Sequence, residues 1–318
     1  MFTRQHPLPQ MSDSLFLTDG GLETTLVFHD GMELPYFAAF DLLKDETGTT
    51  RLRKYYQEYI GLALEYSLGF ILESATWRAS PDWGEQLGYS ATDLDRANHQ
   101  AIELLQELRE RNQTNETPML ISGNLGPRGD GYAAYQKITS DEAATYHAWQ
   151  INSLVDAGVD MITALTLPET EEAIGIVQAC QAADVPSVIS FTVETDGRLP
   201  NGQSLRNAIE VVDEATDTGP AYYMINCAHP THFDRVLKGD ATWLERIRGI
   251  RANASCMSHA ELDDSETLDD GNPEELGQQY RLLRNLLPNL TVLGGCCGTD
   301  HRHVKAIARA CHEYRAVG

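Results

Sequence analysis

Short apolar runs recur along the chain, and longer stretches with helical spacing separate them. Each run has the length and bounding turns of a buried β-strand. The eight predicted strands are residues 15–18, 70–75, 119–122, 161–165, 185–192, 222–225, 249–254 and 290–293. Between them, apolar residues recur every three or four positions, as in residues 51–68, which is the spacing of a helix with one buried face.

Strands and helices alternate through the whole chain. The predicted helices are residues 51–68, 93–111, 140–157, 169–183, 204–216, 231–237, 273–287 and 300–314. Such alternation is typical of α/β proteins with parallel strands and crossover helices. Eight units predict a single-domain (β/α)8 TIM barrel. An open doubly wound sheet is the alternative, but no Gly-x-Gly-x-x-Gly motif opens the first helix.

Two stretches fall outside this alternation. Residues 1–14 are polar and contain two prolines, so they are predicted to form a loose N-terminal arm. The barrel domain is then residues 15–318. Residues 28–50 are predicted to form a long loop, and long loops of this kind are often functional.

Composition excludes several classes of protein. The chain has 318 residues, of which 42% are hydrophobic, enough for a sizeable core. Lys and Arg number 24 against 47 Asp and Glu, so the net charge of −23 argues against a nucleic-acid partner. We interpret the acidic net charge as that of an ordinary acidic enzyme, with a protein of a saline habitat as the alternative. The sequence has neither a run of 18 apolar residues nor a signal-peptide core, so we expect no membrane contact and a cytoplasmic, reducing compartment.

Several reactive side chains follow the predicted strands directly. In a barrel the carboxyl ends of the strands share one face, where active sites are built. The residues at these ends are Asp19, Trp77, Asn226, Cys227, Cys296 and Cys297. The pattern therefore predicts a site at this face.

The adjacent pair Cys296 and Cys297 lies between Gly295 and Gly298. Neighbouring side chains on extended backbone point to opposite sides, so we expect the glycines to bend the chain and aim both sulfurs at one point. With Cys227, three sulfurs suit zinc with one open coordination position, which is typical of a catalytic site. The alternatives are buried core thiols or a disulfide between the adjacent pair. We interpret the other cysteines, Cys180, Cys256 and Cys311, as non-ligands.

Three motifs together resemble the homocysteine S-methyltransferase family. They are Asp19-Gly20-Gly21, Asn226-Cys227 and Gly294-Gly295-Cys296-Cys297-Gly298, and the resemblance spans roughly residues 15 to 312. It implies a (β/α)8 barrel whose three cysteines bind Zn²⁺. In that family the zinc binds the thiolate of homocysteine, which takes a methyl group from a donor. The compact chain is most similar to the enzymes that use S-methylmethionine.

The resemblance also implies where the substrates bind. Asp19, Gly20 and Gly21 are expected to contact the amino-acid part of homocysteine, although glycines here also suit a tight turn. Glu23 is a candidate partner for the substrate ammonium, with a solvated carboxylate as the alternative. Asn226 is expected to orient the site through hydrogen bonds.

The loop after the second strand carries aromatic and cationic candidates. Trp77 and Trp83 offer faces that attract a sulfonium or quaternary ammonium group, with core packing as the alternative. Arg78 stands where a betaine-using relative has an aromatic residue, and Leu165 stands where family members carry a glutamate that contacts the substrate amine. Two interpretations follow: another glutamate (Glu23, Glu73 or Glu194) replaces that contact, or the acceptor is a thiol acid without an amine, its carboxylate held by Arg78.

These observations predict a zinc-dependent S-methyltransferase that moves a methyl group from a sulfonium donor to homocysteine and forms methionine. One alternative is another acceptor thiol or another donor, such as dimethylsulfoniopropionate or betaine. A second is a zinc–thiolate redox or metal sensor in which the adjacent cysteines oxidise and release zinc. The expected partners are small molecules alone, and the sequence does not distinguish a monomer from a homo-oligomer.

Overall fold

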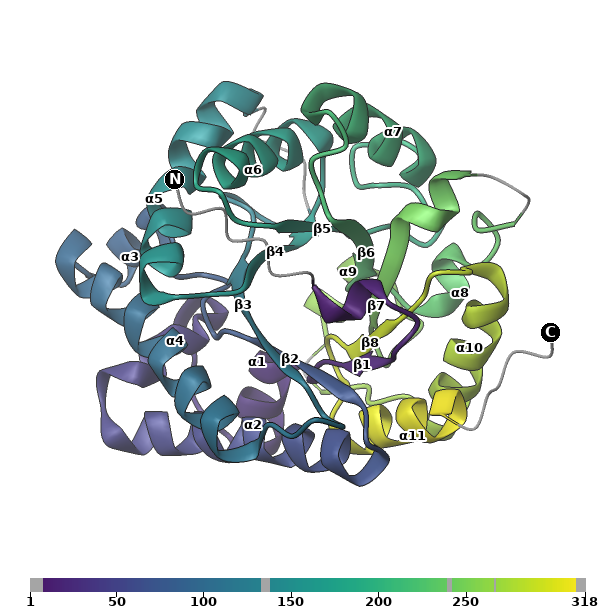
Figure 1. Cartoon of the computed structure of the whole chain (residues 1–318), viewed down its shortest axis with the longest axis horizontal. Helices are drawn as coiled ribbons and strands as arrows, with labels where there is room; N and C mark the ends of the chain where they lie inside the picture. The colour runs from purple at the N-terminus through teal and green to yellow at the C-terminus, as the bar shows by residue number, and fades with distance from the viewer. Residues whose placement is uncertain (1–7, 133–137, 239–241, 266, 313–318) are drawn as a thin grey trace.

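The strands close into one barrel. The computed structural model of the chain describes residues 8–132, 138–238, 242–265 and 267–312. The eight strands are parallel and pair in chain order, and the last pairs with the first (Figure 1). They are β1 (Phe16–Leu17), β2 (Gly69–Glu73), β3 (Met119–Leu125), β4 (Met161–Leu167), β5 (Ser187–Phe191), β6 (Tyr222–Asn226), β7 (Ile247–Ala252) and β8 (Val292–Gly295). The predicted TIM barrel is confirmed.

Helices surround the barrel (Figure 1). The long helices are α2 (Glu46–Tyr66), α4 (Ala91–Asn112), α5 (Ser140–Ala157), α6 (Thr170–Ala182), α7 (Leu205–Thr216), α10 (Pro273–Leu286) and α11 (His301–His312). The short ones are α1 (Leu22–Thr24), α3 (Pro81–Gln86), α8 (Pro230–Phe233) and α9 (His259–Asp263). The predicted range of α5 agrees at both ends because Thr139 and Glu142 form a capping box at its start.

The prediction of a long loop over residues 28–50 is wrong in detail. A π-helical turn, Thr25–His29, is followed by 3-10 helices at Pro35–Phe37 and Ala39–Lys44, and Asp45 then caps α2. The segment Ala39–Lys44 is ordered because most of its apolar side chains are buried. Such short helices carry too few turns to show a period in the sequence.

A cluster of apolar side chains fills the amino-terminal end of the barrel interior. Its members are Leu8, Phe16, Ile71, Leu120, Met161, Val188, Tyr222, Met224 and Val292. Most lie near the beginnings of the strands and alternate with residues that face the helices, as the pleat requires. This cluster closes the amino-terminal end of the barrel.

The described part of the N-terminal arm packs under this cluster. A 3-10 turn, Pro9–Met11, lies across the centre of the ring (Figure 1). Gln10 is fully buried; its amide lies 3.5 Å from the hydroxyl of Tyr222, and its carbonyl oxygen accepts a 2.9 Å hydrogen bond from Thr291. Leu8 and Gln10 therefore pack into the barrel, whereas residues 11–14 of the arm are exposed. Residues 1–7 of the predicted arm lie outside the described residues.

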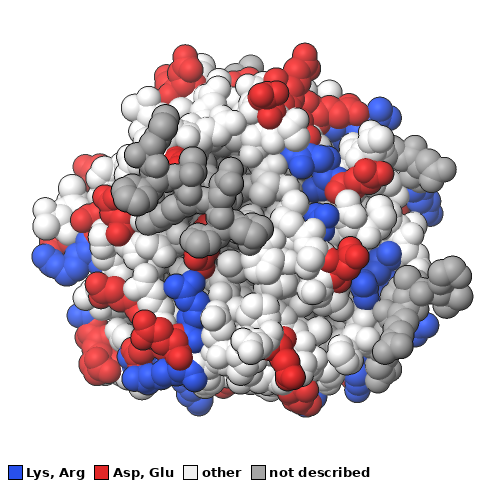
Figure 2. Space-filling model, in the orientation of Figure 1, with Lys and Arg blue, Asp and Glu red and all other residues white. Residues whose placement is uncertain are grey.

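A larger apolar core fills the space between the outer faces of the strands and the helices, with Leu17, Phe70, Leu72, Ile162 and Leu293 among its members. On the face that Figure 2 shows, acidic and basic side chains both lie around the rim, over the surrounding helices. Within the described residues, no helix is both long and apolar enough to cross a membrane.

Candidate metal and substrate site

Three cysteines converge at the carboxyl ends of the strands. Cys227 follows β6, and Cys296 and Cys297 follow β8. Their sulfurs all lie within 4.8 Å of one another, and those of Cys227 and Cys297 are 3.8 Å apart. The sulfurs of Cys227 and Cys296 are in contact, and that of Cys297 lies beside them. The closest pair therefore joins two strands and is not the adjacent pair for which a disulfide was the alternative.

Of the glycines predicted to bend the chain, Gly298 does so, whereas Gly295 serves another purpose. A side chain at Gly294 would collide with the hydroxyl of Thr18, and one at Gly295 would collide with Thr299. These two glycines thus let the backbone of β8 approach its neighbours closely. The sharp bend comes later, at Gly298, where φ is 77°. Gly294 and Gly295 are therefore needed for close packing, and Gly298 for its left-handed backbone conformation.

The separation of Cys227 and Cys297 fits two ligands of a tetrahedral metal ion. Zn–S bonds of about 2.3 Å at tetrahedral angles place sulfurs about 3.8 Å apart, and the sulfurs of Cys227 and Cys297 show this separation. Burial, and then the nearby Glu23 carboxylate, raise the pKa of Cys297 to about 11, so the free thiol keeps its proton at neutral pH. A bound cation would reverse that preference and hold the thiolate.

Asn226 organises the backbone beside the sulfurs. Its side-chain oxygen accepts hydrogen bonds from the Thr166 amide (2.8 Å) and the Ser190 hydroxyl (2.6 Å). Its amide nitrogen donates to the Thr166 hydroxyl at 2.8 Å and lies 3.9 Å from the sulfur of Cys296. Thr166 and Cys227 both have left-handed backbone, with φ of 63° and 53°. The Asn226 side chain supports the Thr166 conformation, as strained residues at functional sites require.

Asp19 is held by a buried arginine. Arg251, on β7, forms an ion pair with Asp19 at 2.7 Å, and the Tyr55 hydroxyl donates to the same carboxylate at 3.0 Å. Arg251 also donates to the carbonyl oxygen of Gly20 at 3.1 Å. The carboxylate of Asp19 is therefore engaged within the protein. Sequence reasoning missed Arg251, although an arginine inside an apolar strand is a signal of a buried ion pair.

The rest of the Asp19-Gly20-Gly21 turn is tightly packed. The Gly21 amide donates to the carbonyl oxygen of Thr299 at 3.0 Å. A side chain at Gly20 would lie 2.7 Å from the Tyr59 hydroxyl, and one at Gly21 would meet Thr24 and the Cys296 carbonyl. The turn thus joins β1 to the cysteine loop.

Two further carboxylates lie inside the barrel. Burial raises the pKa of Glu23 to about 7, and the neighbouring Asp19 raises it further while Arg251 and Arg78 lower it. Burial also raises the pKa of Glu73 to about 7, against the opposing charge of Arg251. Glu23 is within electrostatic range of Cys297.

Arg78 occupies the space between the two tryptophans of its loop. Its guanidinium carbon lies 4.0 Å from the ring centre of Trp77 and 3.8 Å from that of Trp83. The Trp77 indole nitrogen donates to the carbonyl oxygen of Leu165 at 3.3 Å. Leu165 is buried but belongs to neither apolar cluster. One face of each indole predicted to attract a donor cation is therefore covered by a cation of the chain itself.

Tyr132 and His259 are site residues that sequence reasoning missed. The Tyr132 hydroxyl donates to the sulfur of Cys227 at 3.3 Å and lies 4.0 Å from that of Cys297. Its ring packs against His259, with the ring centres 4.3 Å apart. His259 is hydrogen-bonded to the Cys227 carbonyl oxygen at 2.6 Å, and its other nitrogen lies 3.3 Å from Glu194. The only available signal was that Tyr132 follows a glycine-rich loop.

The remaining cysteines lie apart from the triad: Cys180 and Cys311 are buried in α6 and α11, and Cys256 is exposed. Across the described ranges, the triad is the only cluster of three or more His, Cys, Asp or Glu side chains with metal-binding spacing.

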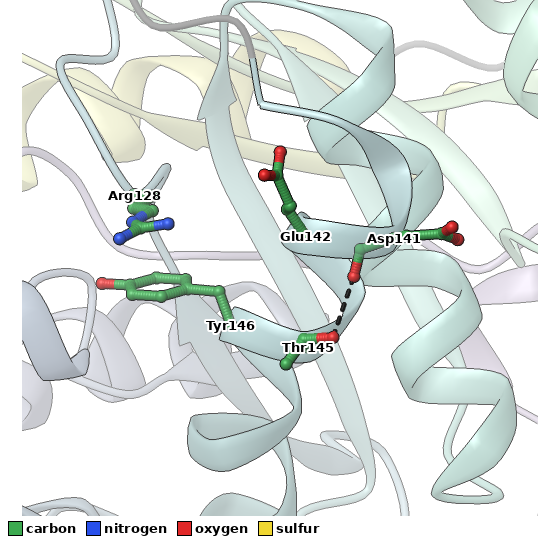
Figure 3. Close-up of a pocket in the computed structure, with 5 residues that line it drawn as sticks. All are labelled: Arg128, Asp141, Glu142, Thr145 and Tyr146. Carbon is green, nitrogen blue, oxygen red and sulfur yellow. Dashed lines mark hydrogen bonds between the residues drawn. The ribbon is translucent and has the colours of Figure 1, made fainter.

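A separate hollow of about 430 Å³ lies beside α5 (Figure 3). It is lined by Arg128, Asp141, Glu142, Thr145 and Tyr146 and includes none of the residues of the barrel mouth.

Known proteins share both the sequence pattern and the fold. The sequence model of homocysteine S-methyltransferase matches residues 16–311. The chain belongs to the homocysteine S-methyltransferase family. Homocysteine S-methyltransferase 1 of Brassica oleracea var. italica is 22% identical over 315 residues, covering 92% of each chain. A selenocysteine Se-methyltransferase of the same plant is 23% identical over 325 residues, covering 95% of this chain and 90% of the relative.

Solved structures of this family have the same fold. The oxidised form of the homocysteine methyltransferase MmuM from Escherichia coli superposes with a TM-score of 0.75 at 18% identity, covering 95% of this chain and 97% of that one. Its metallated form gives a TM-score of 0.71 at 18% identity, covering 94% and 96%. The predicted family and methyltransferase class are confirmed, and the cysteine triad is a candidate metal site.

Proposed function

We propose that this protein is a zinc-dependent S-methyltransferase that methylates homocysteine from a sulfonium donor such as S-methylmethionine and forms methionine. The observation that carries the proposal is the convergence of Cys227, Cys296 and Cys297 at the mouth of a family-matched barrel. Three thiolate donors with room for a fourth ligand favour zinc over harder cations. When bound, zinc supplies a positive charge that keeps the acceptor thiol deprotonated at neutral pH.

The residues of the chain set up the transfer around that ion. The acceptor thiol loses its proton to solvent, and its sulfur then attacks the donor methyl group. A new carbon–sulfur bond forms, the donor carbon–sulfur bond breaks, and its electron pair stays on the donor sulfur, which becomes a neutral thioether. Asn226 and Tyr132 fix the cysteine sulfurs, and the Asp19–Arg251 pair fixes the turn beside them. Positioning of this kind lowers the barrier to an in-line attack.

The charge of the site supports a cationic donor. With zinc bound, three cysteine thiolates and the acceptor thiolate would outweigh the charge of the divalent ion, so a sulfonium group is attracted there and loses its charge as the methyl group leaves. Dimethylsulfoniopropionate and betaine share this property and are tested beside S-methylmethionine. The selenocysteine Se-methyltransferase among the relatives shows that acceptor chemistry varies between related proteins.

A coupled assay tests the proposal. Reduced, zinc-loaded protein is incubated with homocysteine and each donor in turn, and methionine is quantified alongside bound zinc. About one zinc per chain and methionine from a sulfonium donor are expected, in line with a single three-cysteine site. Zinc binding without methylation of any offered thiol would overturn the proposal.

The contact between the Cys227 and Cys296 sulfurs supports a second function, redox control of metal binding. Oxidation removes two of the three sulfur donors at once, so the oxidised protein should release its metal. Zinc release on mild oxidation, with recovery of both zinc and activity after reduction, would identify this control. Retention of zinc by the oxidised protein would exclude it.

A further inference from the structure

The guanidinium of Arg78 is held in one orientation by its neighbours. It lies between the indoles of Trp77 and Trp83, 4.0 Å and 3.8 Å from the two ring centres. Both faces of the planar group are therefore covered, and only its edge remains for hydrogen bonding. A side chain stacked in this way loses little further freedom when it binds a ligand.

Only some of the N–H groups at the edge of the Arg78 guanidinium donate hydrogen bonds. Its Nη1 donates to the carbonyl oxygen of Gly129 at 3.0 Å. Its Nε is buried and has no hydrogen-bond partner, and neither Nε nor Nη2 donates to any residue that the structure describes. Within the same residues, Arg78 forms no ion pair, whereas Arg128 pairs with Asp82 and Arg251 pairs with Asp19. Nε and Nη2 are parallel donors that match the two oxygens of a carboxylate.

Arg78 also lies at the proposed reaction site. Its Nη1 donates to the carbonyl oxygen of Gly129, three residues before Tyr132. The hydroxyl of Tyr132 in turn lies 3.3 Å from the sulfur of Cys227. The guanidinium therefore shares the barrel mouth with the sulfur triad.

We propose that the Nε/Nη2 edge of Arg78 binds the carboxylate of one of the two substrates. This inference rests on the proposed methyl transfer for the identity of those substrates. A carboxylate fits because Arg78 offers parallel N–H donors and has no ion-pair partner among the described residues. Arg78 itself occupies the face of each indole that it contacts. A sulfonium group does not fit against Trp77 and Trp83 themselves, since it would meet the charge of Arg78. The carboxylate can come from the acceptor thiol or from a zwitterionic donor, and the experiment separates the two.

The test compares wild-type enzyme with Arg78→Gln and Arg78→Lys in zinc-loaded form, using substrates with and without a carboxylate. The acceptors are homocysteine and 3-aminopropane-1-thiol, and the donors are S-methylmethionine and trimethylsulfonium. For the substrate whose carboxylate Arg78 binds, Arg78→Gln should raise KM about tenfold to a hundredfold with little change in kcat. The carboxylate-free analogue should show no added penalty. Arg78→Lys should recover part of the loss, because it restores charge without the paired donors.

A loss confined to the two homocysteine reactions assigns the carboxylate to the acceptor, and a loss confined to the S-methylmethionine reactions assigns it to the donor. An equal loss with all four substrate pairs would overturn the inference, because it would show that Arg78 only supports the Gly129 loop. No change with any pair would overturn it too. Arg128→Gln is the matched control, since Arg128 lies over Tyr146 but is already paired with Asp82 (Figure 3).

A binding measurement separates this inference from the proposed function. Homocysteine and S-methylmethionine are each titrated calorimetrically into zinc-loaded wild type and Arg78→Gln. Weaker binding of one of them to Arg78→Gln supports the inference even if no thiol is methylated, in which case the proposed function alone fails. Equal binding to both proteins, or no binding of either compound to wild type, overturns the inference.

Discussion

The two ends of the barrel interior are built from the same eight strands but from opposite chemistry. At the amino-terminal end, side chains such as Phe16, Ile71 and Met161 form an apolar cluster closed by Leu8. At the carboxyl end, Asp19, Asn226 and Arg251 are buried with the cysteine sulfurs. The first end gains stability from burial of apolar surface. The second buries charge and strained backbone, which cost stability and are retained for function.

The largest expected effect of a single change is at the carboxyl end. Cys297→Ala removes one of three metal donors, so we expect loss of tightly bound zinc and of methyl transfer with little change in the fold. Metal analysis, activity and circular dichroism check this. Cys256→Ala is the control, because Cys256 is exposed and lies outside the triad. If Cys297→Ala kept both zinc and full activity, the metal assignment of the triad would be wrong.

Asp19→Asn should impair both stability and activity. It leaves the buried Arg251 charge without its ion-pair partner, which costs about 3–5 kcal/mol in buried pairs. Activity should fall as well, because the turn beside the cysteines loses an anchor. Denaturant unfolding and kinetics measure the two losses. The double variant Asp19→Asn/Arg251→Met should recover part of the stability; no recovery would show that the pair is not the main source of the loss.

Phe16→Ala should affect stability alone. Truncation of a fully buried phenylalanine costs about 3–5 kcal/mol, and Phe16 packs in the apolar cluster at the far end from the sulfurs. Activity per folded molecule should stay within about twofold of wild type, since the change leaves transition-state contacts intact. Urea unfolding and assays well below the unfolding midpoint check this. A large fall in kcat would show that the two ends are coupled.

The smallest expected effect is a change in pH dependence. Burial raises the pKa of Glu73 from 4.5 to about 7, so the folded state retains a proton that the unfolded chain releases. The stability from this protonation is present below pH 4.5 and is lost as the pH rises through about 7. Glu73→Gln does not titrate, so its free energy of unfolding should decline less across that range. An unchanged slope, equal to that of the exposed control Glu110→Gln, would contradict the assigned shift.

Local pattern was enough to predict the barrel. Each predicted strand overlaps the observed one, because the apolar runs have boundaries close to those of the strands. Met161 and Tyr222, for example, begin both the predicted and the observed strand. The π and 3-10 helices between Thr25 and Lys44 were missed because their turns are too short to repeat a pattern. For the described residues, element type was therefore easier to predict than element boundary.

The convergence of the sulfurs could also be predicted, since it follows from the shared face of a barrel. The contacts that complete the site could not. Asp19 and Arg251 are far apart in the sequence, and no local pattern links them. Nor does the sequence reveal that Arg78 contacts two indoles, or that the sulfur of Cys296 contacts that of Cys227.

The pairing of β1 with β8 has a consequence for biosynthesis. Phe16 lies opposite Val292, so the first and last strands meet only after nearly the whole chain has been made. A nascent chain that has emerged through β7 has an open sheet with two unpaired edges and only one of the three sulfurs. Closure of the ring brings Cys296 and Cys297 to Cys227 in the same step that removes those edges. The proposed metal site is therefore complete only once the last strand has closed the ring.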